Sequence, residues 1–358
     1  MAERLFVVES DQAGLRAALV EDRRLQAIEI DRAGHPTKVG GVTHARTVRT
    51  VQGVGTFVRL ADGTEVLLDR GGPTPKAGED IVVQVTRAAR GDKSGGASRS
   101  ISLPGRGVIH LPGESGAKLS KRLDTASAKR ETLEALVAGR PGGWIFRRTA
   151  TNVGVADLTA EIAGLSAEGQ GAEIAPPDAF RRLAMDYGAK APDRILIAGL
   201  AAQRTAERWC RGFAPSLEAL IEPVPAGLFD LHDLDEAIAA LSEPRVALPD
   251  GGSILIEPTE ALTAVDINAG PESNLLSVNL AAAKEVARQL RLRHIGGIVV
   301  IDFISMSRER DRDQLVDALK TAVADDPSQT YILPMSPLGL VEMTRERRGP
   351  GLEAKTDA

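Results

Sequence analysis

The chain has 358 residues, a formal net charge of −5 and a single cysteine, Cys210. This length allows two or three domains with cores that need no covalent staple. A single cysteine excludes an internal disulfide framework and a cysteine-based zinc site within one chain. The first residues, "MAERLFVV", do not form a secretory signal, and no apolar stretch is long enough to span a membrane. We therefore expect a cytoplasmic protein.

The first part of the chain predicts two kinds of structure. Residues 4–31 predict a strand, then a helix over 11–23 with Asp11 as its N-cap, then a second strand. From about 42 to 103 the pattern changes to short β-runs separated by turns, and "ADG" at 61–63 is typical of a hairpin. Several short strands at this spacing favour a small barrel such as an OB-fold.

The segment that follows the barrel is basic. Residues 87–129 carry nine arginine and lysine side chains against few acids: Arg87, Arg90, Lys93, Arg99, Arg106, Lys118, Lys121, Arg122 and Lys129. Because a groove can be locally basic on an acidic protein, the net charge does not exclude nucleic acid. The alternative is a solvated basic loop without a partner.

The rest of the chain alternates helices and strands. A helix is predicted over 128–139, a strand over 142–150, a mostly helical stretch over 155–190, and a short buried strand over 193–199. From 245 onward the pattern is α/β. A hairpin at 245–257 is followed by strand 262–267, helix 277–293, strand 297–303, helix 308–324 and strand 329–334.

Two of these predicted strands end in an aspartate. In "ALTAVDINAG", residues 261–270, the period of two puts Asp266 and Asn268 on one face at the exit of the strand. In the second strand, residues 298–301 are uninterrupted apolar, which is typical of a strand covered on both faces, and Asp302 follows. The helix between them makes a βαβ unit, so the strands are parallel and end at the same sheet edge. Asp266 and Asp302 are therefore expected to meet.

Two carboxylates and an amide oxygen are hard donors that suit Mg²⁺ or Mn²⁺ better than zinc. Such a metal would polarise a phosphate and activate a water for hydrolysis. The alternative is structural: Asp266 makes an Asx-turn and Asp302 caps a loop. The pattern alone leaves both open.

Three segments carry a resemblance to a known family. "TEALTAVDINAG", "AAAKEVARQLRLRHIGGIVVIDFISM" and "LGLVEMTRERR" resemble the catalytic region of the ribonuclease E/G family of bacterial endoribonucleases. The resemblance is specific over 245–348 and weaker but collinear back to residue 1. It implies that Asp266 and Asp302 are metal-binding catalytic acids, with Asn268 as their polar companion.

The resemblance also implies a multidomain α/β and α+β fold. A ribonuclease-H-like subdomain is split by an OB-fold and a 5′-sensor region, and a deoxyribonuclease-I-like α/β catalytic subdomain follows. The implied boundaries are 1–38 and 181–244 for the ribonuclease-H-like parts, 39–99 for the OB-fold, 100–180 for the sensor and 245–358 for the catalytic subdomain.

Binding residues for RNA follow from the same resemblance. Arg148 and Thr149 in "FRRTA" correspond to the pair that recognises a 5′ monophosphate, with Gly105 and Ile109 of "SLPGRGVIHLP" beside it. A guanidinium fork and a hydroxyl suit phosphate oxygens. In the barrel, Phe57 corresponds to an aromatic that stacks on RNA. The remaining RNA-binding candidates are the basic residues Lys93, Lys121 and Arg122.

The sequence departs from the family pattern in several places. A second barrel aromatic is Leu67 here, Ser305 replaces an acid, and Pro337 replaces an arginine. The CPxCxG segment, whose cysteines share a zinc between subunits, is absent from the sequence. We therefore expect no zinc, and a monomer or weak homodimer rather than a zinc-linked tetramer.

The sequence thus predicts a Mg²⁺-dependent endoribonuclease that cleaves single-stranded RNA in RNA processing or decay. One alternative is a non-catalytic RNA-binding protein on the same scaffold. Another is a Mg²⁺ phosphoesterase that acts on a small substrate.

Overall fold

The computed structural model describes residues 3–12, 14–32, 38–89, 94–120, 123, 127–249, 251–271 and 274–348. The chain divides into two compact units. Unit 1 holds residues 1–24 and 28–231, and unit 2 holds residues 25–27 and 232–358. Lys93, Lys121 and Arg122, expected to bind RNA, lie outside the described residues.

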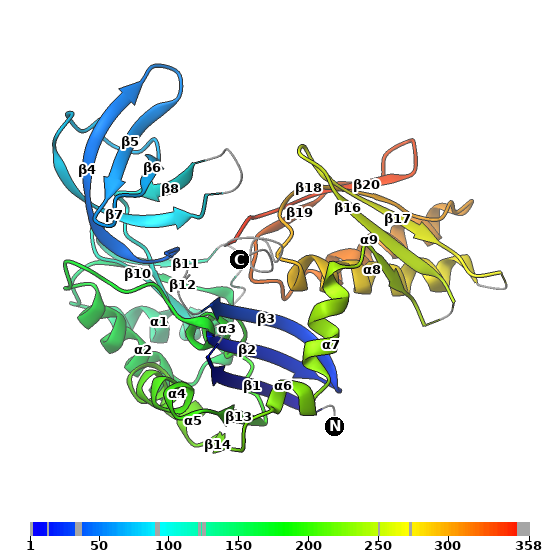
Figure 1. The fold of residues 1–358 in the computed structure, drawn as a ribbon, viewed down its shortest axis with the longest axis horizontal. Coiled ribbons are helices and arrows are strands. Elements are labelled where there is room, and N and C mark those ends of the chain that lie inside the picture. Colours follow the sequence, from blue (N-terminus) through cyan, green and yellow to red (C-terminus); the bar gives the residue numbers. More distant parts are fainter. Residues whose placement is uncertain are drawn as a thin grey trace. The chain divides into compact units, whose positions relative to one another are not determined.

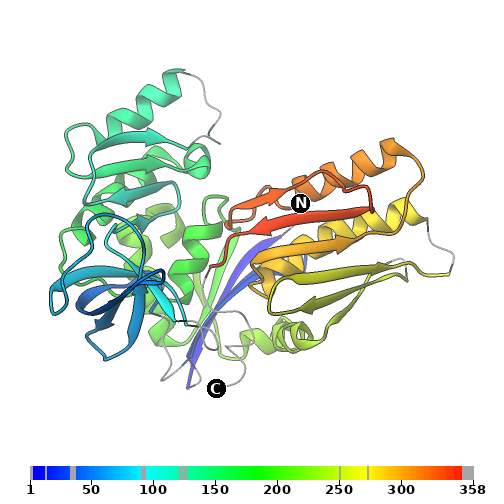
Figure 2. The ribbon, with the colours of Figure 1, turned by 90° about the horizontal axis from the view of Figure 1, so that it is seen from above.

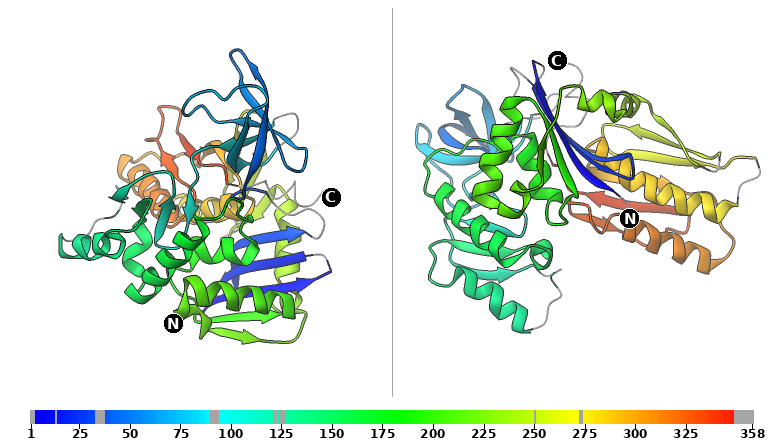
Figure 3. Two further views of the ribbon diagram at one scale, coloured as in Figure 1. Left: turned by 90° about the vertical axis from the view of Figure 1, so that its left-hand side faces the viewer. Right: turned by 90° about the horizontal axis from the view of Figure 1, so that it is seen from below.

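Unit 1 contains a five-stranded sheet in the order β14-β13-β1-β2-β3. Strands β1 and β13 are parallel although they are far apart in sequence, and β1, β2 and β3 follow one another. Helices α3 (Ala179–Tyr187) and α4 (Leu200–Phe213) pack against this sheet, as Figure 3 shows for the green helices beside the blue strands. The strands are β1 (Arg4–Asp11), β2 (Gly14–Glu21), β3 (Arg24–Arg32), β13 (Arg194–Ala198) and β14 (Ile221–Pro223).

The helix predicted over 11–23 is wrong: this segment is strand β2, paired antiparallel with β1. Four consecutive residues, Ala17–Val20, are buried, which is the pattern of a strand inside a core and not of an amphipathic helix. Asp22 and Arg23 both adopt positive φ, at 51° and 61°, and form the tight turn that leads into β3. Aspartate is common in turns but arginine is not, so the pair gives a weaker turn signal than glycine or asparagine at the second position would give.

The expected barrel is present. Strands β4 to β8 close in the order β4-β5-β6-β8-β7 around a core that includes Val58, Leu60 and Val83. Figure 1 shows them in blue and cyan. The closed five-stranded barrel is consistent with an OB-like domain. Its strands are β4 (Val42–Val51), β5 (Gly55–Leu60), β6 (Glu65–Leu68), β7 (Asp80–Arg87) and β8 (Gly95–Ser98).

The remaining part of unit 1 is a four-stranded sheet in the order β11-β12-β10-β9, packed with helix α2 around Trp144, Phe146 and Ile162. Its strands are β9 (Leu103–Pro104), β10 (Val108–Leu111), β11 (Gly116–Leu119) and β12 (Gly143–Phe146). The helices of unit 1 are α1 (Ser127–Val137), η1 (Arg148–Asn152, 3₁₀), α2 (Val155–Glu168), α3 (Ala179–Tyr187), α4 (Leu200–Phe213), α5 (Pro215–Glu218) and α6 (Leu228–Leu231).

Unit 2 is built on a six-stranded sheet in the order β15-β16-β17-β18-β20-β19. The strands are β15 (Arg245–Ala247), β16 (Ser253–Pro258), β17 (Thr263–Asn268), β18 (Gly297–Asp302), β19 (Thr330–Ile332) and β20 (Leu340–Arg345). The helices are α7 (Leu234–Ala239), η2 (Ala240–Ser242, 3₁₀), α8 (Leu275–Leu292) and α9 (Glu309–Ala322). The predicted β17–α8–β18 unit is confirmed, with the two strands parallel.

One face of this sheet carries the core of unit 2. Val265, Ile267, Val299 and Ile301 pack with α8 and α9, which lie together along the sheet in Figure 2. On the opposite face, Ile298 of β18 is 51% exposed. The expectation that β18 is covered on both faces is therefore wrong, because its run of apolar residues supplies the core with only every second side chain.

No described helix combines the length and the apolar character that crossing a bilayer requires.

Candidate functional site

The two strand-end aspartates lie side by side. Strands β17 and β18 pair in parallel, and their register sets Asp266 directly opposite Asp302. Both side chains are exposed on the face away from α8 and α9. Their neighbours along the strands, Val265, Ile267 and Ile301, point to the opposite face, into the core. The geometric expectation from the sequence, that the two acids meet at one edge of the sheet, is thus confirmed.

Asn268 belongs to the same face of β17. Its amide Nδ2 donates a hydrogen bond to Asp266 Oδ2 over 2.8 Å. The structural alternative, in which Asp302 caps a loop, has no hydrogen bond to support it among the described residues. The site is therefore a pair of neighbouring carboxylates with one amide, placed by strands whose opposite faces are buried.

A residue that the sequence reasoning missed holds the segment after Asp302. Asn279 of α8 is fully buried, and its side chain both donates to Ile304 O (2.8 Å) and accepts from Ile304 N (3.1 Å). This two-point bond fixes the backbone where the chain leaves β18, and Phe303 beside it is buried. The available signal was a polar residue next to the apolar stripe of α8, which begins at Val278.

The segments expected to sense a 5′ end also come together. Strands β10 and β12 are antiparallel with Val108 opposite Phe146, so the turn before β10 meets the chain that leaves β12. The Thr149 hydroxyl donates to Arg106 O, and Arg147 N donates to Gly107 O over 2.8 Å. Arg148 is exposed at the start of η1.

Gly105 and Ile109 contribute backbone rather than side-chain chemistry to this region. Gly105 N donates to Val108 O over 2.8 Å, which closes the turn before β10. A Cβ at Gly105 would collide with the carboxylate of Glu161, so close packing requires glycine there. Ile109 is half-buried one residue further along, opposite Ile145 of β12.

A buried ionic network underlies the turn at 105–107. The carboxylate of Glu161 on α2 accepts from Arg106 N and from Gly107 N. The Arg106 guanidinium donates to Asp157 Oδ2 over 2.9 Å, and Asp157 also accepts from Ser216. Burial raises the pKa of Glu161 above its ordinary value. The sequence showed these residues only as helix and loop positions.

Phe57 lies on the outer surface of the barrel, half-buried on β5. The guanidinium of Arg49 sits over its ring, 4.7 Å from the ring centroid. Leu67 is directly opposite Phe57 on β6. The expected stacking residue is therefore on the barrel surface, but its ring already has a neighbour.

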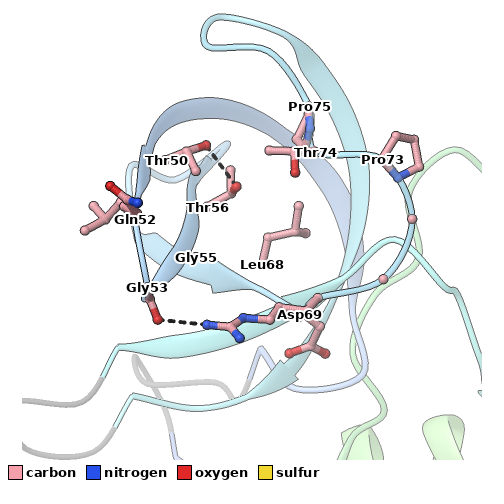
Figure 4. Close-up of a pocket in the computed structure, with 14 residues that line it drawn as sticks. Thr50, Gln52, Gly53, Gly55, Thr56, Leu68, Asp69, Pro73, Thr74 and Pro75 are labelled. Carbon is pink, nitrogen blue, oxygen red and sulfur yellow. Dashed lines mark hydrogen bonds between the residues drawn. The ribbon is translucent and has the colours of Figure 1, made fainter.

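A separate cavity of about 540 Å³ opens where β4 and β6 end and β5 begins. Figure 4 shows Thr50, Thr56, Leu68 and Thr74 around it, with Thr50 Oγ1 and Thr56 Oγ1 joined over 3.0 Å. The Arg70 guanidinium donates to Gly53 O (2.8 Å) and ties the two sides together. The cavity was not foreseen from the sequence, because the two loops that frame it meet only in the folded barrel.

Comparison with known proteins identifies the family of the chain. Residues 102–348 match the family described as "Ribonuclease E/G family". The "Ribonuclease G" of Escherichia coli strain K12 is 29% identical over 385 residues, which cover 94% of this chain and 78% of that protein. The "Ribonuclease E" of Synechocystis sp. is 31% identical over 300 residues, which cover 76% of this chain and 44% of that protein.

A further relative, "Ribonuclease E" of Escherichia coli strain K12, is 29% identical over 397 residues, which cover 98% of this chain and 37% of that protein. These matches class the chain with the RNA-cleaving hydrolases. The chain belongs to the ribonuclease E/G family, as its sequence motifs predicted.

Proposed function

We propose that this protein is a Mg²⁺-dependent endoribonuclease that cleaves single-stranded RNA in RNA processing or decay. The observation that carries the proposal is the register of Asp266 against Asp302 on adjacent parallel strands, on a chain of the ribonuclease E/G family. Two adjacent exposed carboxylates repel each other unless a cation lies between them. Neither acid has a basic side chain as a partner among the described residues, so the pair is suited to an external cation.

The donor set fits a magnesium ion. Asp266, Asp302 and Asn268 offer only hard oxygen ligands, and the described residues contain no group of three or more His, Cys, Asp or Glu side chains placed to hold a metal. Mg²⁺ usually keeps several waters and binds through one or two carboxylates, so a site of this size is sufficient. When bound, the ion would supply Lewis-acid stabilisation of phosphate charge and a more acidic water.

The protein's own residues would do the positioning. Asn268, two residues further along β17, orients the Asp266 carboxylate through its hydrogen bond. Asn279 fixes the backbone just after Asp302. Both acids are therefore oriented by the scaffold before any substrate arrives, which lowers the cost of ordering the site.

We further propose that Arg148 recognises a 5′ monophosphate. Arg148 is exposed at the start of η1, where a guanidinium fork can contact phosphate oxygens. The Thr149 hydroxyl donates to Arg106 O, so Thr149 links η1 to the turn at 105–107 beside the proposed phosphate position. Gly105 and Ile109 would supply the adjoining backbone.

The test is cleavage of a fluorogenic single-stranded RNA by the purified full-length protein. The substrate is prepared with a 5′ monophosphate or a 5′ hydroxyl and incubated with Mg²⁺ or with EDTA. We expect internal cleavage with Mg²⁺ only, faster for the monophosphate. Binding without cleavage would favour the RNA-binding alternative, and equal rates on both RNAs would contradict the sensor proposal alone.

We also propose a monomer or weak homodimer that holds no zinc. Cys210, the one cysteine of the sequence, is fully buried on α4, and burial raises the pKa of its thiol to about 12. A thiol buried in the core of one chain is not accessible to a zinc shared between subunits. Light scattering combined with elemental analysis tests this, and a tetramer that dissociates on chelation would contradict it.

A further inference from the structure

On the outer surface of the barrel around Phe57, the side chains of β4, β5 and β6 lie in two neighbouring cross-strand rows. Cα pairing places Arg46 opposite Arg59 and Arg59 opposite Glu65 in one row. In the next row, Arg49 is opposite Phe57 and Phe57 is opposite Leu67. Three arginines and one ring thus occupy neighbouring positions on β4 and β5.

A β-bulge brings Arg49 onto this surface. In a regular strand, residues three apart point to opposite faces, so Arg46 and Arg49 would lie on different sides of β4. The register shifts between Thr47 and Arg49, which inserts one extra residue and returns Arg49 to the outer face. Bulges commonly re-aim a side chain in this way, and here the re-aimed side chain is set over Phe57.

The guanidinium of Arg49 is held in place from two sides. It lies over the Phe57 ring at 4.7 Å from the centroid, and its Nη1 donates to Glu65 Oε2 over 3.0 Å. Glu65 also accepts from Arg59 Nη2 over 2.7 Å, so one carboxylate bridges two arginines. The Arg49 side chain is 54% exposed, which leaves the plane of its guanidinium accessible from the solvent side.

We propose that Arg49, backed by Phe57, is the stacking platform for one base of single-stranded RNA. Guanidinium planes stack on bases as aromatic rings do, and a cation over a ring adds its own attraction. Arg49 would thereby supply the second stacking plane that Leu67, opposite Phe57, does not offer. This inference rests on the proposed function, since it requires RNA as the ligand.

The neighbouring row provides a place for the RNA backbone. Arg46 and Arg59 line a groove of about 650 Å³ together with His44 and Asp80. The side chains of Arg46 and Arg59 are 68% and 55% exposed, so both can contact phosphates without rearrangement of the barrel core. A base on Arg49 and a phosphate at this groove are compatible with one strand that crosses β4 and β5.

The experiment separates stacking from charge. The full-length protein is titrated in EDTA with short single-stranded RNAs that carry 2-aminopurine at each position in turn, whose fluorescence is quenched by stacking. Arg49→Lys keeps the charge but removes the planar guanidinium. We expect Arg49→Lys and Arg49→Ala to weaken binding alike, by about five- to a hundredfold, and to abolish the quenching at one position. Phe57→Leu should weaken it too.

The matched control is Arg211→Lys, the same change at an exposed arginine of α4 that faces no ring in the described structure, and it should bind RNA as the wild type does. Wild-type binding and quenching in Arg49→Lys would overturn the inference while leaving the proposed nuclease intact. If the wild type does not bind single-stranded RNA, both this inference and the proposed nuclease function are overturned. Circular dichroism confirms that the barrel of each variant is folded.

Discussion

Two pairs of acids in this protein have opposite surroundings. Asp157 and Glu161 lie one turn apart on α2, buried, and each accepts hydrogen bonds from Arg106, Gly107 or Ser216. Asp266 and Asp302 lie side by side on β17 and β18, exposed, and among the described residues they accept a single side-chain hydrogen bond, from Asn268 to Asp266. Proximity of carboxylates alone therefore does not distinguish a structural pair from a functional one.

The difference lies in what neutralises the charge. Burial acts to raise the pKa of Asp157, but hydrogen bonds from Ser216 and then Arg106 outweigh it and hold the pKa below its ordinary value. For Glu161 burial prevails, and the pKa rises in spite of nearby Arg106. The buried pair is thus satisfied within the protein, whereas the exposed pair has no basic side chain as a partner among the described residues. The following predictions test this contrast, from the largest expected effect to the smallest.

The largest effect is expected from Asp302→Asn, or equally from Asp266→Asn. Each removes one charge from the proposed metal site, so cleavage should fall on the order of a thousandfold. The melting temperature should stay the same or rise, because a like-charge repulsion is relieved. Initial rates on single-stranded RNA and a thermal melt measure both quantities. Glu257→Gln, at an exposed acid on β16, is the control and should cleave as the wild type does. Near-normal cleavage by Asp302→Asn or by Asp266→Asn would contradict the proposed metal site.

In the buried pair, Asp157→Ala should act on stability instead. It leaves the guanidinium of Arg106 buried without its carboxylate, which costs about 3–5 kcal/mol of unfolding free energy. Urea unfolding followed by tryptophan fluorescence suits this measurement, since both tryptophans, Trp144 and Trp209, belong to unit 1. The Arg106 guanidinium also donates to Gly188 O (3.3 Å) and Phe213 O (3.4 Å), and a loss below about 1 kcal/mol would show that these carbonyls alone satisfy it.

Arg148→Ala should change substrate preference and leave stability nearly unaltered. A lost charge-assisted hydrogen bond is worth about 1.5–3 kcal/mol, so the rate advantage of monophosphorylated RNA should fall roughly ten- to a hundredfold. Rates on 5′-hydroxyl RNA serve as the internal control and should not change. An equal fall on both substrates would mean that Arg148 acts on catalysis or folding and not on the 5′ end.

The smallest effect concerns pH and Glu161. Because its folded-state pKa is above the ordinary 4.5, the contribution of Glu161 to stability is fully present below pH 4.5 and is lost as the pH rises through the folded pKa. Glu161→Gln does not titrate, so its unfolding free energy should decline less over that range, by at most about 1.4 kcal/mol per pH unit. Parallel pH profiles for both proteins would contradict the raised pKa.

The geometry of the candidate site in unit 2 could be predicted because the sequence features that determine it are close together in the chain. Strand, helix and strand follow one another in residues 263–302, and a helical crossover between neighbouring strands makes them parallel, so that they end together. The alternation in β17 then fixes which face carries Asp266 and Asn268. No long-range contact is needed for this inference, so the acids could be paired from the sequence.

Strand β2 and the buried ionic network of unit 1 could not be predicted, because they depend on contacts between residues far apart in the sequence. The sequence of β2 predicts a short helix when its pairing with β1 is not known. The turn after β2 has Asp22 and Arg23 at positive φ, where glycine would be expected. Glu161 meets Arg106 and Gly107 across more than fifty residues of chain. Burial of these charges is a tertiary property, which neither periodicity nor composition encodes.

The strand order of unit 2 has a consequence for biosynthesis. β20 is made after β19 but inserts between β19 and β18, so the strand that ends in Asp302 gains its outer neighbour only when residues 340–345 are present. A nascent chain that emerges from the ribosome from its N-terminus therefore exposes one edge of β18 until late. The proposed hydrolytic centre would thus be completed only once residues 340–345 have been made, after the barrel has already been synthesised.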